Sequence, residues 1–353
     1  MKGLNKIYAD RTIHCVAAGE GASKAAVDMA LIYHHPLYES DSRRRTRITL
    51  VLDSLENLHD FLFEYRELLD NSYWRVVDLR GEEIKPESHR PMYAGQRKDF
   101  VDVEWEFVIG RFSHPALQSK IELWSRDTRQ QLLIALCYAD TAKSARYAAK
   151  LRGRLPAEVV IETVDPTQAE NPADNPMLVA MAKYLNYCYK VSYDEGIVPT
   201  ELPEEAVEKA WEELADERMR LSNIYNVRSI PFKMLLLGHD MDDWDKFYAL
   251  SADEIERLTA VEHNRWSVDR LIQGVRPCTD EERMEIAADI SLKRRYARER
   301  GAHFDLCAFT ELGVDETGLP VTRYDRDLTA AIPLIVKTYA DRHANGQALH
   351  TDR

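Results

Sequence analysis

The sequence predicts an α/β protein: a doubly wound, mostly parallel sheet in the N-terminal part, followed by a mainly α-helical domain. Short apolar runs typical of buried strands alternate with amphipathic helical segments as far as residue 164. A stretch rich in Pro, Asn and Asp follows at 164–175, and the pattern beyond it is helical. Because strands alternate with helices, we expect parallel strands joined by right-handed crossovers.

The elements of the first part follow one another closely and define an expected domain at 1–165. We expect strands at 13–18, 48–52, 74–79, 101–110, 131–138 and 158–164. Helices are expected at 25–33, 55–69 and 115–124, and a fourth reaches residue 151 from an N-cap at Asp140 or Thr141. The segment 34–47 is expected to be a polar insertion, with His34 and His35 in a loop.

The second part contains several helix-start signals. Ser251 with Glu254 forms one capping box and Thr279 with Glu282 another, and Gly301 is a typical helix end. Helices are expected at 176–189, 204–221, from 251 through the central segment, at 280–300 and at 325–336. We therefore expect a helical connecting segment at 166–240, a helical domain at 241–342 and a disordered tail at 343–353.

Composition excludes several classes of protein. The net charge of −13 and pI near 5.4 argue against nucleic acid as a partner. The sequence contains no run of 18 or more apolar residues, so it predicts no membrane insertion. Its first residues lack the apolar core of a signal peptide. The five cysteines are scattered without a Cys-x-x-Cys pair, which favours reduced thiols and a cytoplasmic location.

A glycine turn between the first strand and the first helix is the candidate cofactor site. Gly19, Gly21, Ser23 and Lys24 lie where a helix N-terminus can bind a phosphate, and Asp53 ends the next strand, where an acid can bind ribose. NAD or another nucleotide is the expected cofactor. The alternative is a purely structural turn, because Glu20 would repel a phosphate and Lys24 stands where the fingerprint has its third glycine.

The first half resembles the TrkA-N nucleotide-binding domain of potassium-channel regulators, through the runs IHCVAAGEGASK and ALCYADTAKSARYAAKLRGRLP. The resemblance covers about residues 10–165. It implies a Rossmann-like fold and a nucleotide at the glycine turn.

The most concentrated polar cluster is VEHNRWSVDRL at 261–271, inside an otherwise apolar helix. Arg side chains bind phosphate or carboxylate and Trp stacks on a base, so Glu262, His263, Arg265, Trp266 and Arg270 are candidate ligand-binding residues. Arg265 is three residues from Glu262, which favours that pair and leaves Arg270 for a ligand. The alternative is a partly buried Trp with a structural Glu–Arg pair.

The second half resembles the RyR domain, first seen as a repeat in ryanodine receptors and present in prokaryotic proteins. The matching residues are EHNRW, Arg270, Gly274, His303, Leu306, Leu312 and YDRDL…IP, and Arg220 and Asn223 match the segment that precedes the domain. The resemblance implies a small-ligand sensing module without catalytic activity. Glu262, His263, Arg265, Trp266, Arg270, His303, Arg220 and Asn223 are therefore the expected ligand-binding set.

Hydrolase and zinc-enzyme motifs do not occur in the sequence, so no catalytic or metal-binding residues are assigned. The preferred hypothesis is a regulatory protein that senses a nucleotide or nucleotide-derived ligand. One alternative is an enzyme acting on a nucleotide or sugar phosphate, with Glu262 or His263 as acid–base. A second is a structural module that forms a homodimer.

Overall fold

The computed structural model describes residues 11–84, 100–168, 171–239, 249–315 and 317–343. The chain divides into two compact units. The first unit comprises Met1–Ala169 and Ser267–Glu311, and the second comprises Glu170–Trp266 and Leu312–Arg353. This division differs from the consecutive segments expected from the sequence, because each unit takes part of the expected helical domain. The expected tail beyond residue 343 lies outside the described residues.

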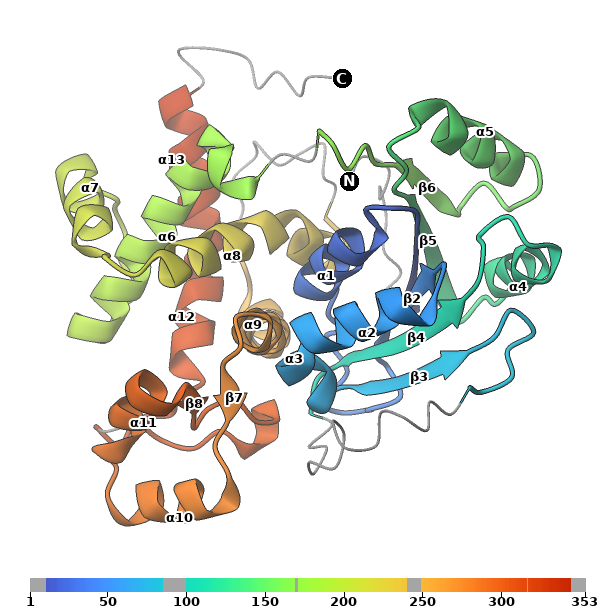
Figure 1. The fold of residues 1–353 in the computed structure, drawn as a ribbon. Helices are drawn as coiled ribbons and strands as arrows, with labels where there is room; N and C mark the ends of the chain where they lie inside the picture. The colour runs from blue at the N-terminus through green and yellow to red at the C-terminus, as the bar shows by residue number, and fades with distance from the viewer. Residues whose placement is uncertain (1–10, 85–99, 169–170, 240–248, 316, 344–353) are drawn as a thin grey trace. The chain divides into compact units, whose positions relative to one another are not determined.

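The first unit is built on a six-stranded sheet in the order β3-β4-β2-β1-β5-β6 (Figure 1). The strands are β1 (Thr12–Ala18), β2 (Thr46–Leu52), β3 (Tyr73–Val77), β4 (Val103–Ile109), β5 (Gln130–Leu136) and β6 (Val160–Thr163). Every neighbouring pair in this sheet is parallel. The predicted parallel α/β sheet is therefore confirmed, with each strand within a few residues of its expected position.

Helices cover the sheet on both faces (Figure 1). They are α1 (Ala22–Ile32), α2 (Leu55–Glu64), α3 (Arg66–Asp70), α4 (Pro115–Ser125) and α5 (Thr141–Arg152). The chain leaves β1 toward β2 on one side and later returns to place β5 on the other side of β1. This reversal between β1 and β5 makes the sheet doubly wound, and ligands of such sheets bind at the carboxyl ends of the strands there.

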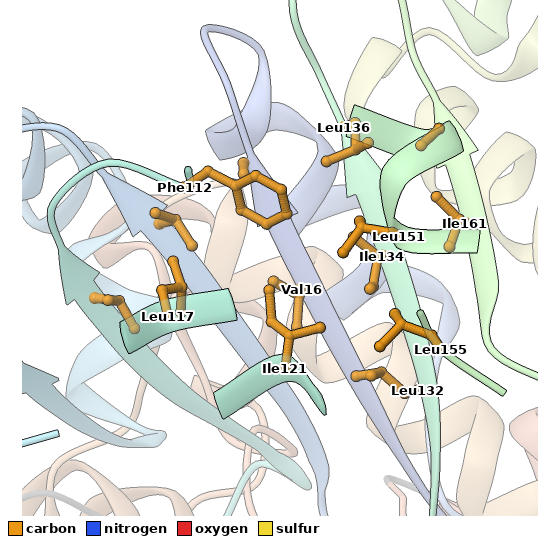
Figure 2. Packing of buried hydrophobic residues seen from close by; sticks show 14 of the residues in the cluster. Val16, Phe112, Leu117, Ile121, Leu132, Ile134, Leu136, Leu151, Leu155 and Ile161 are labelled. Carbon is orange, nitrogen blue, oxygen red and sulfur yellow. The ribbon is translucent and has the colours of Figure 1, made fainter. Parts of the chain in front are cut away.

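One face of the sheet packs against α4 and α5 through a continuous apolar cluster (Figure 2). Val16 and Ile134 lie side by side in the register of β1 and β5, and Leu117 and Ile121 of α4 are fully buried with them. The intervening residues of β1, such as Cys15 and Ala17, point to the opposite face of the sheet and are also buried. Burial on both faces explains why these strands are almost entirely apolar in sequence.

Two details of this part differ from the sequence predictions. The helix expected at 55–69 is two helices, because the chain departs from helical geometry at Tyr65. Segment 34–47 is not a simple polar insertion, since His34 and His35 are buried. The predicted N-cap of α5 is confirmed: the Asp140 carboxylate accepts a hydrogen bond from the Lys143 amide at 3.0 Å.

The remainder of the first unit contains two short parallel strands and two helices. These elements are β7 (Arg276–Pro277), α10 (Asp280–Ala288), α11 (Leu292–Arg300), β8 (Ala302–His303) and the 3-10 turn η4 (Phe309–Glu311). The capping box of Thr279 and Glu282 and the helix end at Gly301, which has φ +60°, are confirmed. The expected helix 280–300 is broken between Ala288 and Leu292, where the chain turns.

The second unit is helical. Its elements are η2 (Pro172–Asp174), α6 (Pro176–Glu195), α7 (Glu204–Glu213), α8 (Glu217–Leu236), α12 (Arg323–Ala330) and α13 (Ile332–His343), and α9 (Ala252–Ile272) belongs to it as far as Trp266. Asn175 caps α6, which ends at Gly196 with φ +70°. The capping box of Ser251 and Glu254 at the start of α9 is confirmed.

Two helix predictions for the second unit were wrong. The helix expected at 204–221 ends at Glu213, and a new helix begins at 217 behind an Asp216 N-cap and continues through Pro231. The helix expected at 325–336 is divided between α12 and α13 at Ala331. Among the described residues, no helix combines the length and apolar character needed to cross a membrane.

Candidate functional site

The polar cluster of the central helix forms a hydrogen-bonded network centred on the Glu262 carboxylate. Lys233 of α8 donates to Oε2 at 2.6 Å, and the Asn226 amide donates to Oε1 at 2.8 Å. Arg265 donates through Nε at 3.0 Å and through Nη2 at 2.8 Å. Lys233 also donates to Asn226 Oδ1 at 3.0 Å, which closes the network between the two helices. The predicted pairing of Arg265 with Glu262 is therefore confirmed.

This network lies inside the second unit. Glu262 and Lys233 are each 1 % exposed and Arg265 is 2 % exposed. Burial alone would raise the pKa of Glu262, but the charges of Arg265 and Lys233 and their hydrogen bonds outweigh burial and hold that pKa below its ordinary value. Burial lowers the pKa of Lys233, and the neighbouring Glu262 charge opposes that shift. The geometry thus keeps the Glu262 side chain as a carboxylate.

Two further residues extend the cluster toward the surface. His263 is 1 % exposed, and its Nδ1 lies 3.4 Å from Oδ2 of Asp325 on α12. Its ring lies 5.7 Å from the Trp266 ring, at an interplanar angle of 31°. Trp266 itself is half-buried, so it is the one member of EHNRW with appreciable exposure.

The other expected ligand residues have structural contacts. Arg220 donates to the carbonyl oxygens of Leu214 and Trp211, at the end of α7, and its guanidinium lies over the Trp211 ring. Asn223 donates to Asn186 Oδ1 at 3.4 Å. These contacts tie α8 to α7 and α6, so the sequence match at these two positions has a packing explanation.

Arg270 and His303 belong to the first unit and are described with it. Arg270 is 8 % exposed and donates to Gln273 Oε1 at 3.3 Å. His303 is half-buried in β8, and its Nδ1 accepts from the Asp305 amide at 3.3 Å. Arg270 is thus buried and donates to Gln273, just beyond the end of α9, and its availability to a ligand stays a prediction.

The glycine turn of the first unit is packed tightly by its own chain. Gly19 has φ +111°, and a Cβ there would stand 2.3 Å from the Cys137 carbonyl oxygen. A Cβ on Gly21 would stand 2.5 Å from Pro166 Cβ. Both glycines are therefore required by the approach of neighbouring segments, an explanation that needs no ligand.

Acidic side chains surround this turn. Glu20 Oε2 accepts from the Ala139 amide at 3.3 Å and its other oxygen lies 3.9 Å from Lys143 Nζ. Burial and Tyr147 raise the pKa of Tyr138, and Asp53 and Glu20 raise it further. Ser23 is half-buried and Lys24 is exposed. The carboxyl end of β1 thus presents carboxylates where a dinucleotide would place its phosphates.

Gly21→Ala is expected to lower the free energy of unfolding by about 1–3 kcal/mol, the cost of overpacking, because the new methyl group meets Pro166. Gly153→Ala is the matched control, since its Cβ would have only ordinary contacts at 3.7 Å in right-handed helical geometry. It should be neutral or stabilising by about 0.4–1 kcal/mol. Urea unfolding of both variants checks this, and equal stabilities would contradict it.

A second buried polar group lies at the amino end of β4. Asp102 Oδ1 lies 2.7 Å from His34 Nδ1, and its Oδ2 accepts from the His35 amide at 3.1 Å. The Asp102 carbonyl accepts from the Thr46 amide, so one residue joins the segment after α1 to the starts of β2 and β4. The two histidines lie in a loop, as expected, but they are buried and hydrogen-bonded to Asp102.

Glu282 of α10 pairs with Arg276 of β7 and with Arg300 at the end of α11. Arg276 Nη1 donates to Glu282 Oε2 at 2.7 Å, and Arg300 donates to Glu282 Oε1 at 3.1 Å. The hydrogen bond from Arg276, assisted by the Thr279 amide and Arg300, outweighs burial and lowers the pKa of Glu282 to about 2. Glu282 therefore combines a helix-capping role with an ion-pair role.

Glu282→Gln separates these two roles, because glutamine preserves the capping box and removes the charge. A depressed folded-state pKa stabilises the fold fully above the ordinary value of 4.5 and loses that effect as pH falls toward 2. The stability difference between wild type and variant should be constant near neutral pH and shrink below about pH 4.5. Urea unfolding across pH measures it, with exposed Glu281→Gln as control; a pH-independent difference would contradict it.

All five cysteines are buried. Burial raises the pKa of Cys137 and Cys188 to about 12 and also raises that of Cys15, which makes these three thiols poor nucleophiles. Within the described ranges, no group of three or more His, Cys, Asp or Glu side chains is arranged to hold a metal ion.

Comparison of the chain with known protein families, with characterised proteins and with solved structures found no match. The residues missed by the sequence predictions are Asn226, Lys233 and Asp325, all from helices far from EHNRW in the chain. Lys233 gave one signal, since a lysine inside an apolar helical run requires a buried counter-charge, and Asp325 gave another, because it lies in the matching run YDRDL.

Proposed function

We propose that the protein is a non-catalytic regulatory protein whose helical unit binds a nucleotide or nucleotide-derived anion beside Trp266. The observation that carries this proposal is the buried network of Lys233, Glu262 and Arg265. Buried ion pairs contribute little net stability and often cost free energy relative to apolar packing. Apolar residues of similar volume at these positions often stabilise a helical unit equally well, so the presence of the ion pairs favours a functional role.

The charge balance of the network favours an anionic ligand. Two basic side chains, Lys233 and Arg265, share one carboxylate at Glu262. The formal charge of these three side chains is therefore positive by one, which attracts an anion. The half-buried Trp266 indole adds a planar surface on which a base can stack.

The same geometry argues against acid–base catalysis by Glu262. Its two oxygens accept five hydrogen bonds from Lys233, Asn226 and Arg265 within 3.0 Å, and its lowered pKa keeps it ionised. A general acid or base needs a pKa near the working pH and access to the substrate. A binding role is therefore favoured over the nucleotide-processing enzyme considered from the sequence.

The test is a calorimetric titration of wild type with NAD, NADP, ATP, ADP-ribose and cyclic nucleotides, followed by chromatography of the ligand for products. We expect saturable binding of one compound without turnover, weakened in Trp266→Leu and retained in Trp211→Leu, the control on α7. Turnover would establish the enzyme alternative. No binding by any compound at millimolar concentration would refute the proposal.

A further inference from the structure

Three side chains of the second unit lie next to one another in succession: Asp325 on α12, then His263, then the half-buried Trp266 indole. Asp325 Oδ2 lies 3.4 Å from His263 Nδ1, and the His263 ring lies 5.7 Å from the Trp266 ring. The side chains of Asp325 and His263 are 14 % and 2 % exposed, and Trp266 is half-buried. The middle member is thus shielded from solvent, and the last is the one within reach of a ligand.

The contact with Asp325 has a defined chemical effect on the imidazole. The two ring nitrogens of histidine differ, and the hydrogen bond made by one of them sets the tautomer and the ring orientation. A carboxylate beside Nδ1 holds the proton there. His263 and Trp266 are three residues apart on α9, so they share one side of the helix. When the His263 ring is held in one orientation, it limits the orientations that the neighbouring Trp266 ring can adopt.

We propose that Asp325 and His263 are positioning residues, which set the orientation of the Trp266 indole on which a planar ligand stacks. This inference rests on the proposed function for the ligand, while the positioning itself is a property of the unliganded protein. His263, expected from the sequence to bind the ligand directly, is here a positioning residue. Because it is buried, it acts on the ligand through Trp266.

The arrangement also gives α12 a role in the site. Asp325 lies on α12, which is tied to α6 by a 2.5 Å hydrogen bond from Ser192 Oγ to Asp327 Oδ2. Asp327 thus offers a matched control: it is a carboxylate on the same short helix, and its side chain contacts α6, whereas that of Asp325 contacts α9. If substitution of Asp325 changes the Trp266 site and substitution of Asp327 does not, loosening of α12 alone cannot explain the change.

The experiment compares Asp325→Leu, the conservative Asp325→Asn, and Asp327→Asn in the full chain. Imidazole nitrogen chemical shifts report the tautomer of His263, and the indole N–H resonance of Trp266, assigned with Trp266→Phe, reports the ring environment. Titration with NAD and ADP-ribose reports affinity. Asp325→Asn keeps an oxygen acceptor, so it provides a readable variant even where Asp325→Leu fails to fold.

Wild type and Asp327→Asn are expected to show the proton on Nδ1 and the same indole resonance. Asp325→Leu should lose the Nδ1–H tautomer, shift the indole resonance and weaken ligand binding about 2- to 10-fold, the range for one lost hydrogen bond. Asp325→Asn should fall between them. Unchanged tautomer and indole signals in both Asp325 variants, or equal shifts in Asp327→Asn, would overturn the positioning roles. Failure of wild type to bind any nucleotide would overturn the proposed function alone.

Discussion

Glu262→Gln is expected to destabilise the protein by about 3–5 kcal/mol, the cost of breaking a buried ion pair by removing one partner. The carboxylate is the shared acceptor of Lys233 and Arg265, both at least 98 % buried, so its loss leaves two basic side chains without their counter-charge. Glutamine has nearly the same shape, which confines the effect to the charge. Urea unfolding at neutral pH measures the loss.

Two comparisons make this result specific to the network. Glu256→Gln removes an exposed carboxylate from the same helix and should change stability by no more than about 0.5 kcal/mol. The double variant Glu262→Gln with Lys233→Met should lose less unfolding free energy than the sum of the losses in the two single variants. The reason is that Lys233→Met removes one of the two charges that Glu262→Gln leaves uncompensated. If the two glutamate variants were equally stable, the network would have no energetic role.

The sheet was predictable because its strands are buried on both faces. Runs 13–18 and 131–138 are apolar except for His14 and Gln131, and an apolar run of this length with glycine or aspartate just after it has few other interpretations. The alternation with helices then limits the topology to parallel strands with crossovers. The order of the strands needed the structure, since no local pattern says which strands become neighbours.

The broken helices show a limit of helical periodicity. An apolar stripe continues through 204–221 and through 280–300, so periodicity alone predicts one helix in each case. The structure interrupts both, and each interruption is next to an Asp: Asp216 caps α8, and the Asp289 carboxylate accepts from the Ser291 amide at 3.0 Å. An aspartate that binds nearby backbone amides competes with the helix, and this was the overlooked signal.

The candidate site was predictable in composition but not in its contacts. The i to i+3 spacing of Glu262 and Arg265 predicts their pair correctly, because helix geometry alone brings them together. Lys233 and Asp325 come from helices 29 and 62 residues away in sequence and reach the cluster only through tertiary packing. Sequence therefore identified the polar residues of one helix, and the structure supplied the partners that decide their charge state and exposure.

Asp102→Asn is expected to destabilise the first unit by about 2–4 kcal/mol. A hydrogen bond to a charged group contributes roughly 1.5–3 kcal/mol, and a buried donor left without an acceptor costs roughly 1–3 kcal/mol. Both Asp102 oxygens are used, one by His34 and one by the His35 amide, and the Asp102 and His34 side chains are fully buried. An amide group offers one acceptor oxygen. Either one of the two donors then loses its acceptor, or the His34 imidazole must move its proton to Nε2, which is buried without a hydrogen-bond partner among the described residues.

Thermal or urea unfolding measures the loss, and hydrogen exchange at the His35 amide locates it, since that amide donates to Asp102. Asp127→Asn is the matched control: Asp127 pairs with Arg129 two residues away at the surface, and such exposed pairs contribute at most about 1 kcal/mol. A destabilised Asp102→Asn with unchanged exchange at His35 would place the effect elsewhere. If Asp102→Asn were as stable as Asp127→Asn, the buried carboxylate would not be what holds the segment after α1 to the start of β4.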